Sequence, residues 1–136
     1  MSSSTKEYSI RVFYEDTDAG GVVYYANYLK FFERARTEWL RDLAINQSQL
    51  LEQNIAFVVR KVEMDNIASA QLDDLLSVKS QIQEIKRASL VFSQRILNEK
   101  QQLLCTATIR IACVNLVKAK PCAIPQELLG VLKSVG

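Results

Sequence analysis

Hydrophobic and polar positions alternate with a period of two at several places along the chain. The first stretch covers residues 8–15, where Tyr8, Ile10, Val12 and Tyr14 share one face of an extended chain. Similar runs cover residues 76–82, 90–96 and 103–115, and residues 56–64 are rich in β-branched side chains. Alternation and β-branched content are typical of strands. Five strands are therefore predicted.

A helical period replaces this alternation between residues 27 and 42. Apolar side chains recur there at spacings of three and four, which places them on one face of a helix: Tyr28, Leu29, Phe31, Phe32, Ala35, Trp39, Leu40 and Leu43. The opposite face is charged, with Lys30, Glu33, Arg34, Arg41 and Asp42. A long amphipathic helix is predicted here. Shorter helices are expected around residues 48–53 and after Pro125, which suits a first helical position.

The order of these elements indicates an α+β fold. The last three strands follow one another through short polar connections, and only antiparallel neighbours can be joined by so few residues. The single long helix must then cover one face of the sheet. Because the sequence contains no repeat, low-complexity tract or linker, residues 1–136 are expected to form a single domain.

Composition narrows the chemistry that this domain can perform. The chain contains no histidine, which excludes Ser-His-Asp and Cys-His catalysis and every metal site that needs imidazole, and no metal is expected. The 17 Lys and Arg residues against 15 Asp and Glu residues give a net charge of +2, too small for a nucleic-acid binder. No apolar run approaches the ~20 residues of a membrane span, so a cytoplasmic protein is predicted.

The three cysteines form no CxxC pair. Cys105 and Cys113 lie eight residues apart in one predicted strand, roughly 26 Å at strand rise, so they are not expected to bond to each other. Together with Cys122, they are predicted to be small buried apolar side chains of a protein in a reducing compartment.

Candidate chemistry concentrates in residues 14–28, between the first strand and the long helix. Asp16 and Asp18 lie there beside the pair Gly20 and Gly21. The unpaired N–H groups at a helix start can polarise a carbonyl, and a carboxylate nearby can attack that carbonyl or activate water. The alternative is that both aspartates only form an Asx turn or cap the helix.

This segment, followed by residues 29–41, resembles the signature of hotdog-fold acyl-CoA thioesterases of the 4-hydroxybenzoyl-CoA thioesterase family. The YbgC-type branch, the Tol-Pal-associated thioesterases of bacteria, is the most similar. The resemblance continues through residues 56–61, 88–96 and 118–121. It implies a five-stranded antiparallel sheet wrapped around the long helix. It also implies hydrolysis of an acyl-CoA substrate to a free acid and coenzyme A, without a cofactor.

The same resemblance implies roles for particular residues. The second acid of the D-x-D triplet is Asp18, as nucleophile or general base, and the backbone N–H of Tyr25 polarises the carbonyl. Gly21, Val22 and Tyr24 belong to the loop that the substrate approaches. Many YbgC-type sequences have His in place of Tyr25, and a phenol with a pKa near 10 is no general base at neutral pH. The replacement of His by Tyr25 is expected to change the rate or the acyl preference only if that side chain orients substrate or water.

Coenzyme A carries several phosphate charges, so cationic side chains are expected near the site. Lys86, Arg87 and Ser89 match the basic, phosphate-contacting turn of the family. Arg60 and Lys61 are a second candidate, and the alternative for them is a solvated strand end.

Glu33 and Glu38 lie on the predicted long helix, and other hotdog branches use a carboxylate on that helix instead of one in the loop. Here, ion pairs one turn away are expected instead: Glu38 with Arg34 or Arg41, and Glu33 with Arg36.

The open sheet edges predict a homodimer or homotetramer, and the resemblance implies that two chains share the site. The alternative function is a non-catalytic acyl-CoA or acyl-carrier binding protein, a scaffold of envelope or phospholipid metabolism. Acyl-carrier protein and phospholipid-synthesis enzymes are the macromolecular partners considered. The sequence does not predict the acyl chain.

Overall fold

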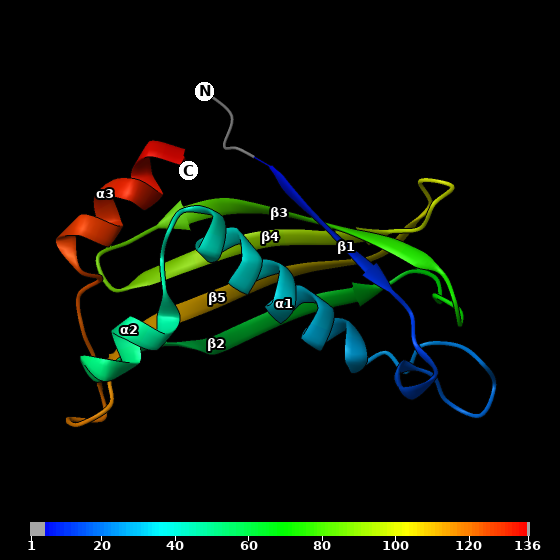
Figure 1. Ribbon diagram of the computed structural model, residues 1–136, viewed down its shortest axis with the longest axis horizontal. Helices are drawn as coiled ribbons and strands as arrows, with labels where there is room; N and C mark the ends of the chain where they lie inside the picture. Colours follow the sequence, from blue (N-terminus) through cyan, green and yellow to red (C-terminus); the bar gives the residue numbers. More distant parts are fainter. Residues whose placement is uncertain (1–4, 136) are drawn as a thin grey trace.

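The computed structural model describes residues 5–135. Every predicted strand and helix is present (Figure 1). In chain order the elements are β1 (Lys6–Arg11), a 3₁₀ turn (Tyr14–Asp16), α1 (Asn27–Asp42), α2 (Gln47–Glu52), β2 (Ile55–Asn66), β3 (Leu75–Ile85), β4 (Ser89–Leu97), β5 (Leu103–Asn115), β6 (Lys120–Pro121) and α3 (Gln126–Val135).

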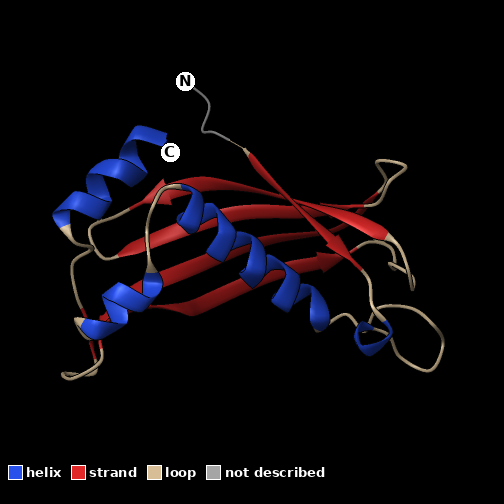
Figure 2. Cartoon of the chain, viewed as in Figure 1, coloured by secondary structure: helices blue, strands red, loops and turns tan. Residues whose placement is uncertain are grey.

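The strands form one antiparallel sheet in the order β1-β3-β4-β5-β2. The sheet curls around α1, which lies along its inner face, while α2 and α3 lie at one end (Figure 2). The predicted five-stranded sheet around one long helix is confirmed. A sixth strand, β6, pairs with the end of β5 and is only two residues long, so no alternation could predict it.

The inner face of α1 forms the core against the sheet. Tyr28, Phe32 and Trp39 are at most 2% exposed, and the ring of Trp39 meets Phe92 of β4 edge to face at 5.5 Å. Burying such side chains contributes about 1.5–3 kcal/mol each. The predicted stripe is confirmed except for Leu29, which is 38% exposed beside β2.

The first strand is shorter than predicted, since it ends at Arg11 rather than at residue 15. Asp16 is the cause, because its Oδ2 accepts the Phe13 N–H at 2.9 Å and turns the chain into the 3₁₀ turn. Tyr14 therefore does not share the face of Ile10 and is 82% exposed.

A buried polar network, which the sequence did not reveal, joins α1 to the sheet. Arg36 is 6% exposed, and its Nη1 donates to Gln94 Oε1 at 3.0 Å. The Nε2 of Gln94 donates to Phe32 O at 3.0 Å and to Ser80 Oγ at 2.8 Å. Burial lowers the pKa of Arg36 to about 10, and the nearby Glu33 charge opposes that shift.

This network overturns one predicted ion pair. Because Arg36 turns inward to Gln94, it forms no salt bridge with Glu33. The predicted pair of Glu38 with Arg41 is confirmed.

The cysteines are all free thiols. Cys105 and Cys113 are buried, as predicted, whereas Cys122 is only partly buried. None of the helices between residues 5 and 135 is long and apolar enough to span a membrane.

Candidate active site

Asp18 lies in a tight loop between the 3₁₀ turn and α1. Its backbone N–H donates to Val22 O at 2.9 Å, and its carbonyl accepts the Gly21 N–H at 3.1 Å. Below it, Thr17 and Val23 form an antiparallel bridge. Gly21 has a φ of +79°, which an L side chain tolerates poorly. The conformation of the loop therefore explains why an aspartate stands at position 18 and a glycine at position 21.

The carboxylate of Asp18 is exposed, and its Oδ1 accepts the Gly20 N–H at 2.8 Å. This is the Asx turn considered from the sequence. It occupies one oxygen, and no hydrogen bond to Oδ2 exists within the described residues. The turn therefore orients the carboxylate and leaves its second oxygen facing solvent.

The loop is attached firmly to the rest of the domain. Val23 N–H donates to Ala70 O at 2.8 Å, and Leu72 N–H donates to Gly21 O at 3.1 Å. On the other side, Asn27 Nδ2 donates to Asp16 O at 2.9 Å. The carboxylate of Asp16 is already bound to the Phe13 N–H, so of the two aspartates Asp18 is the one whose carboxylate remains available.

The start of α1 lacks the usual side-chain cap. Its N-cap is Ala26, and the first turn contains no acidic residue. Between residues 5 and 135, no acceptor exists for the backbone N–H of Tyr25 or Ala26. Free amides and the positive end of the helix dipole therefore lie in the segment that follows Asp18.

The side chains of Tyr24 and Tyr25 are about half exposed, at 51% and 55%. Their rings lie 5.1 Å apart and are tilted against each other. Neither ring is fixed in the core, so both are available for contact with a bound molecule. This exposure is compatible with the role predicted for the Tyr25 amide, which needs only the backbone.

The basic turn is a compact reversal between β3 and β4. Lys86 N–H donates to Ser89 O at 2.8 Å, and the side chains of Lys86 and Arg87 are exposed. Lys86 Nζ lies 3.3 Å from Glu84 Oε1. Ser89, the first residue of β4, is partly buried. The turn presents two adjacent cations, as predicted.

Within one chain, however, the turn between β3 and β4 and the loop between β1 and α1, which contains Asp18, lie at opposite ends of the sheet (Figure 1). Val12, just before the Asp18 loop, donates its N–H to Asp74 O beside the start of β3. The turn follows the other end of β3, and eleven residues of strand span roughly 33 Å. One chain therefore does not bring Asp18 and Lys86 together.

Arg60 and Lys61 lie in the middle of β2 and not at a strand end, although both side chains are exposed to solvent, as that alternative expected. The pairing of β2 with β5 shifts register between Val59 and Lys61, and this irregularity leaves Arg60 without a partner in the ladder. Lys61 Nζ lies 3.0 Å from Glu63 Oε1. Both cations are exposed on the free edge of the sheet.

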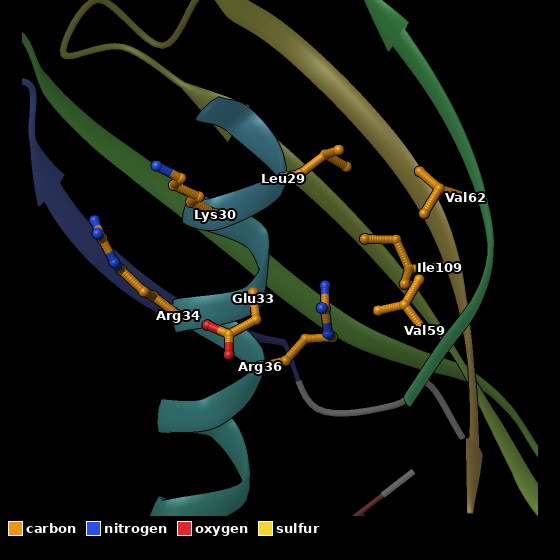
Figure 3. A pocket seen from close by; sticks show the side chains of 8 residues that line it. All are labelled: Leu29, Lys30, Glu33, Arg34, Arg36, Val59, Val62 and Ile109. Carbon is orange, nitrogen blue, oxygen red and sulfur yellow. The ribbon is translucent and has the colours of Figure 1, made fainter. Parts of the chain in front are cut away.

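A groove of about 480 Å³ separates α1 from β2. Figure 3 shows Leu29 facing Val59, Val62 and Ile109 across it, with the guanidinium of Arg36 pointing inward and Lys30 and Arg34 pointing away. Sequence reasoning missed this groove because its walls come from three separate elements. The valines of β2 were the feature of the sequence that could have indicated this groove, because a free edge strand seldom exposes valine side chains to water.

Among the described residues, no cluster of cysteine and acidic side chains is placed to hold a metal ion. The features available for binding and catalysis are a carboxylate, free backbone amides, an apolar groove and exposed cations.

Comparison with known proteins identifies the family. The model of the thioesterase-like superfamily matches residues 12–132. The chain belongs to this superfamily.

Relatives within the thioesterase-like superfamily cover most of the chain. An acyl-CoA thioesterase YbgC from Haemophilus influenzae is 52% identical over 89% of each chain. An acyl-CoA thioester hydrolase YbgC from Escherichia coli is 44% identical over 98% of this chain and 99% of its own. A probable thioesterase from Bartonella henselae, of known crystal structure, has a TM-score of 0.84 and 39% identity, over 90% of this chain and 100% of its own. These matches confirm the family and the hotdog fold that the sequence predicted.

Proposed function

We propose that this protein hydrolyses the thioester of an acyl-CoA, with the carboxylate of Asp18 as nucleophile or general base. The observation that carries the proposal is that one loop holds both an exposed, oriented carboxylate and, eight positions later at Ala26, the uncapped start of α1. The YbgC relatives are named an acyl-CoA thioesterase and an acyl-CoA thioester hydrolase, which supports the reaction and substrate class. We place the reaction in the cytoplasm, in keeping with the free thiols.

In the proposed reaction, the thioester carbonyl oxygen accepts a hydrogen bond from the Tyr25 N–H. This contact, with the positive end of α1, stabilises the negative charge that develops on the oxygen. Asp18 either attacks the carbonyl carbon directly or removes a proton from the water that attacks. Collapse of the tetrahedral intermediate breaks the C–S bond, and the departing coenzyme A thiolate takes up a proton. If water is the nucleophile, this step gives the free acid directly. If Asp18 is the nucleophile, the acyl group is left as a mixed anhydride on Asp18, and water then hydrolyses this anhydride to the free acid and restores the carboxylate. No metal or cofactor takes part.

We further propose that two chains pair through the free edge of β2 and share the site. The exposed fractions of Val58, Val59 and Val62 are 40%, 51% and 38%, so this edge presents apolar side chains to water. A two-fold axis across β2 turns the second chain end for end. The basic turn of one chain then approaches the Asp18 loop of the other. The two parts of the site, which lie far apart within one chain, are thereby brought together. A tetramer is the next closed assembly of such dimers.

The test of the activity is a hydrolysis screen over short, long and aromatic acyl-CoAs, in which a thiol-trapping reagent detects free coenzyme A. We expect turnover of at least one class. Tight binding of acyl-CoA without turnover would instead support the alternative of a non-catalytic binding or scaffold protein.

Lys86 and Arg87 are proposed to bind the phosphates of coenzyme A. Replacing both with Ala is expected to raise KM for acyl-CoA about tenfold and to change kcat much less, because contacts far from the carbonyl contribute uniform binding. The matched control removes two exposed cations elsewhere, Lys100→Ala with Lys133→Ala. A truncated thioester without the nucleotide should show no difference between wild type and variant. Equal loss on that substrate would mean that the turn is only structural.

A further inference from the structure

Cys113 and Cys122 lie side by side although they are nine positions apart in the sequence. Their Sγ atoms are 3.6 Å apart, and Cys122 N–H donates to Cys113 O at 2.9 Å. This pair extends the β5–β6 ladder by one position beyond Val114 and Pro121. Both thiols are free.

The backbone places these thiols within range of a bond. Opposed residues of antiparallel strands have Cα atoms about 4.5–5.5 Å apart, inside the range that disulfides span. A disulfide needs the sulfur atoms about 2 Å apart, so they must approach by about 1.5 Å. Cys122 follows a strand of only two residues, so its side of the pair can adjust without disturbing a long strand.

We propose that Cys113 and Cys122 are a modification site that a hydroperoxide converts to a reversible disulfide. The sulfur of Cys122 attacks the peroxide and becomes a sulfenic acid, while an alcohol or water leaves. Cys113 then attacks this sulfur, the S–S bond forms, and the sulfenic oxygen leaves as water. Two thiols lose two electrons and two protons in total, and the peroxide takes them up.

The order of the two steps follows from exposure. Cys122 is partly exposed, whereas Cys113 is buried, and burial together with the neighbouring Cys122 thiol raises the pKa of Cys113 to about 12. Cys122 therefore meets the oxidant first, and Cys113 is the resolving thiol. Because a buried thiol of high pKa is a slow nucleophile, the second step sets the rate.

The pair lies directly behind the basic turn. Cys113 N–H donates to Ala88 O at 2.9 Å, and Ile124 N–H donates to Arg87 O at 2.8 Å. The backbone of the turn is thus held by β5 on one side and by the segment after Cys122 on the other. A disulfide links these two supports. Its effect on acyl-CoA binding rests on the proposed function, whereas its formation does not.

Peptide mapping after peroxide treatment tests the disulfide on the full chain. We expect a Cys113–Cys122 cross-linked peptide within one chain, loss of alkylation at both residues, and recovery with a thiol reductant. Cys105 is the internal control, because its Sγ contacts Asn66 rather than another cysteine, and it should remain alkylated. Oxidation of Cys122 to sulfinic acid without a cross-link, a bond between chains, or equal reaction of all three cysteines would overturn the proposal.

The kinetic consequence is measured on reduced and oxidised protein. We expect oxidation to raise KM for acyl-CoA about threefold, with no change in the KM of a truncated thioester. Cys122→Ser should abolish this effect, and Cys105→Ser should retain it. An unchanged KM with the cross-link present would refute the link to the turn. No turnover by the reduced protein would instead refute the proposed function.

Discussion

Asp18→Asn is expected to lower kcat about 10²–10⁴-fold if Asp18 is a general base, and more if it is the nucleophile. The amide oxygen of Asn can still accept the Gly20 N–H at Asp18's Oδ1 position, so the Asx turn and the loop survive. What the variant loses is the charge on the second oxygen, which faces solvent. Steady-state turnover of the best acyl-CoA, with thiol trapping, measures the effect.

Glu15→Gln is the matched control, because Glu15 is an exposed carboxylate three residues away in the same segment. It should retain activity within a few-fold of wild type. Asp16→Asn should act mainly through stability, since that carboxylate holds the 3₁₀ turn together. If Asp18→Asn retained activity close to that of Glu15→Gln, Asp18 would not be catalytic and Glu33, which lines the α1–β2 groove, would become the candidate.

Gln94→Leu is expected to lower the free energy of unfolding by about 3 kcal/mol. The leucine fills most of the volume but removes the acceptor of Arg36 Nη1, which leaves a buried guanidinium without its partner in the sheet. It also removes the two hydrogen bonds to Phe32 O and Ser80 Oγ. Urea unfolding at a fixed protein concentration, followed by the fluorescence of the single buried tryptophan, Trp39, measures the loss.

A second variant separates the unpaired charge from the lost packing. Combining Gln94→Leu with Arg36→Met replaces the polar pair by two apolar side chains, so the double variant should be more stable than Gln94→Leu alone. Gln83→Leu, at an exposed position of β3, should change stability by no more than about 0.5 kcal/mol. A double variant less stable than Gln94→Leu would contradict this account of Arg36.

The elements with strong periodicity could be predicted from the sequence almost to the residue. The bounds of α1 and β5 match the prediction. A long apolar stripe favours helix, and a long alternation favours strand, over any other local structure of the same residues. The position of Asp18 beside a helix start could also be predicted, since a strand, a glycine pair and a helix follow one another within residues 8–42.

Contacts between distant segments could not be predicted in the same way. Arg36 has the side chain of a surface residue, and its partner Gln94 lies 58 positions away, so only the folded chain shows that it is buried. The Asp16 hydrogen bond that shortens β1 overrides the alternation through Tyr14. The pairing of Cys113 with Cys122 depends on β6, a strand too short to leave a pattern.

In the proposed function, the complete site exists only where two chains meet. The local motifs predicted both Asp18 and the basic turn, and nothing in either motif showed that they lie at opposite ends of the sheet. Pairing of two chains through the free edge of β2, where valines are exposed, is our proposal for how the two are brought together. The central claim is therefore that Asp18 of one chain acts on a substrate held by the Lys86–Ser89 turn of another.

Active-site complementation tests this claim most directly. Asp18→Asn protein and Lys86→Ala/Arg87→Ala protein are mixed, their subunits are exchanged, and turnover is measured at acyl-CoA well below the KM of the double variant. Differently tagged chains verify the exchange. In a shared dimer site, half of the dimers are mixed and each has one intact site, so activity should return to about a quarter of wild type. Activity no higher than the average of the two variants after verified exchange would show that each chain works alone and would contradict the shared site.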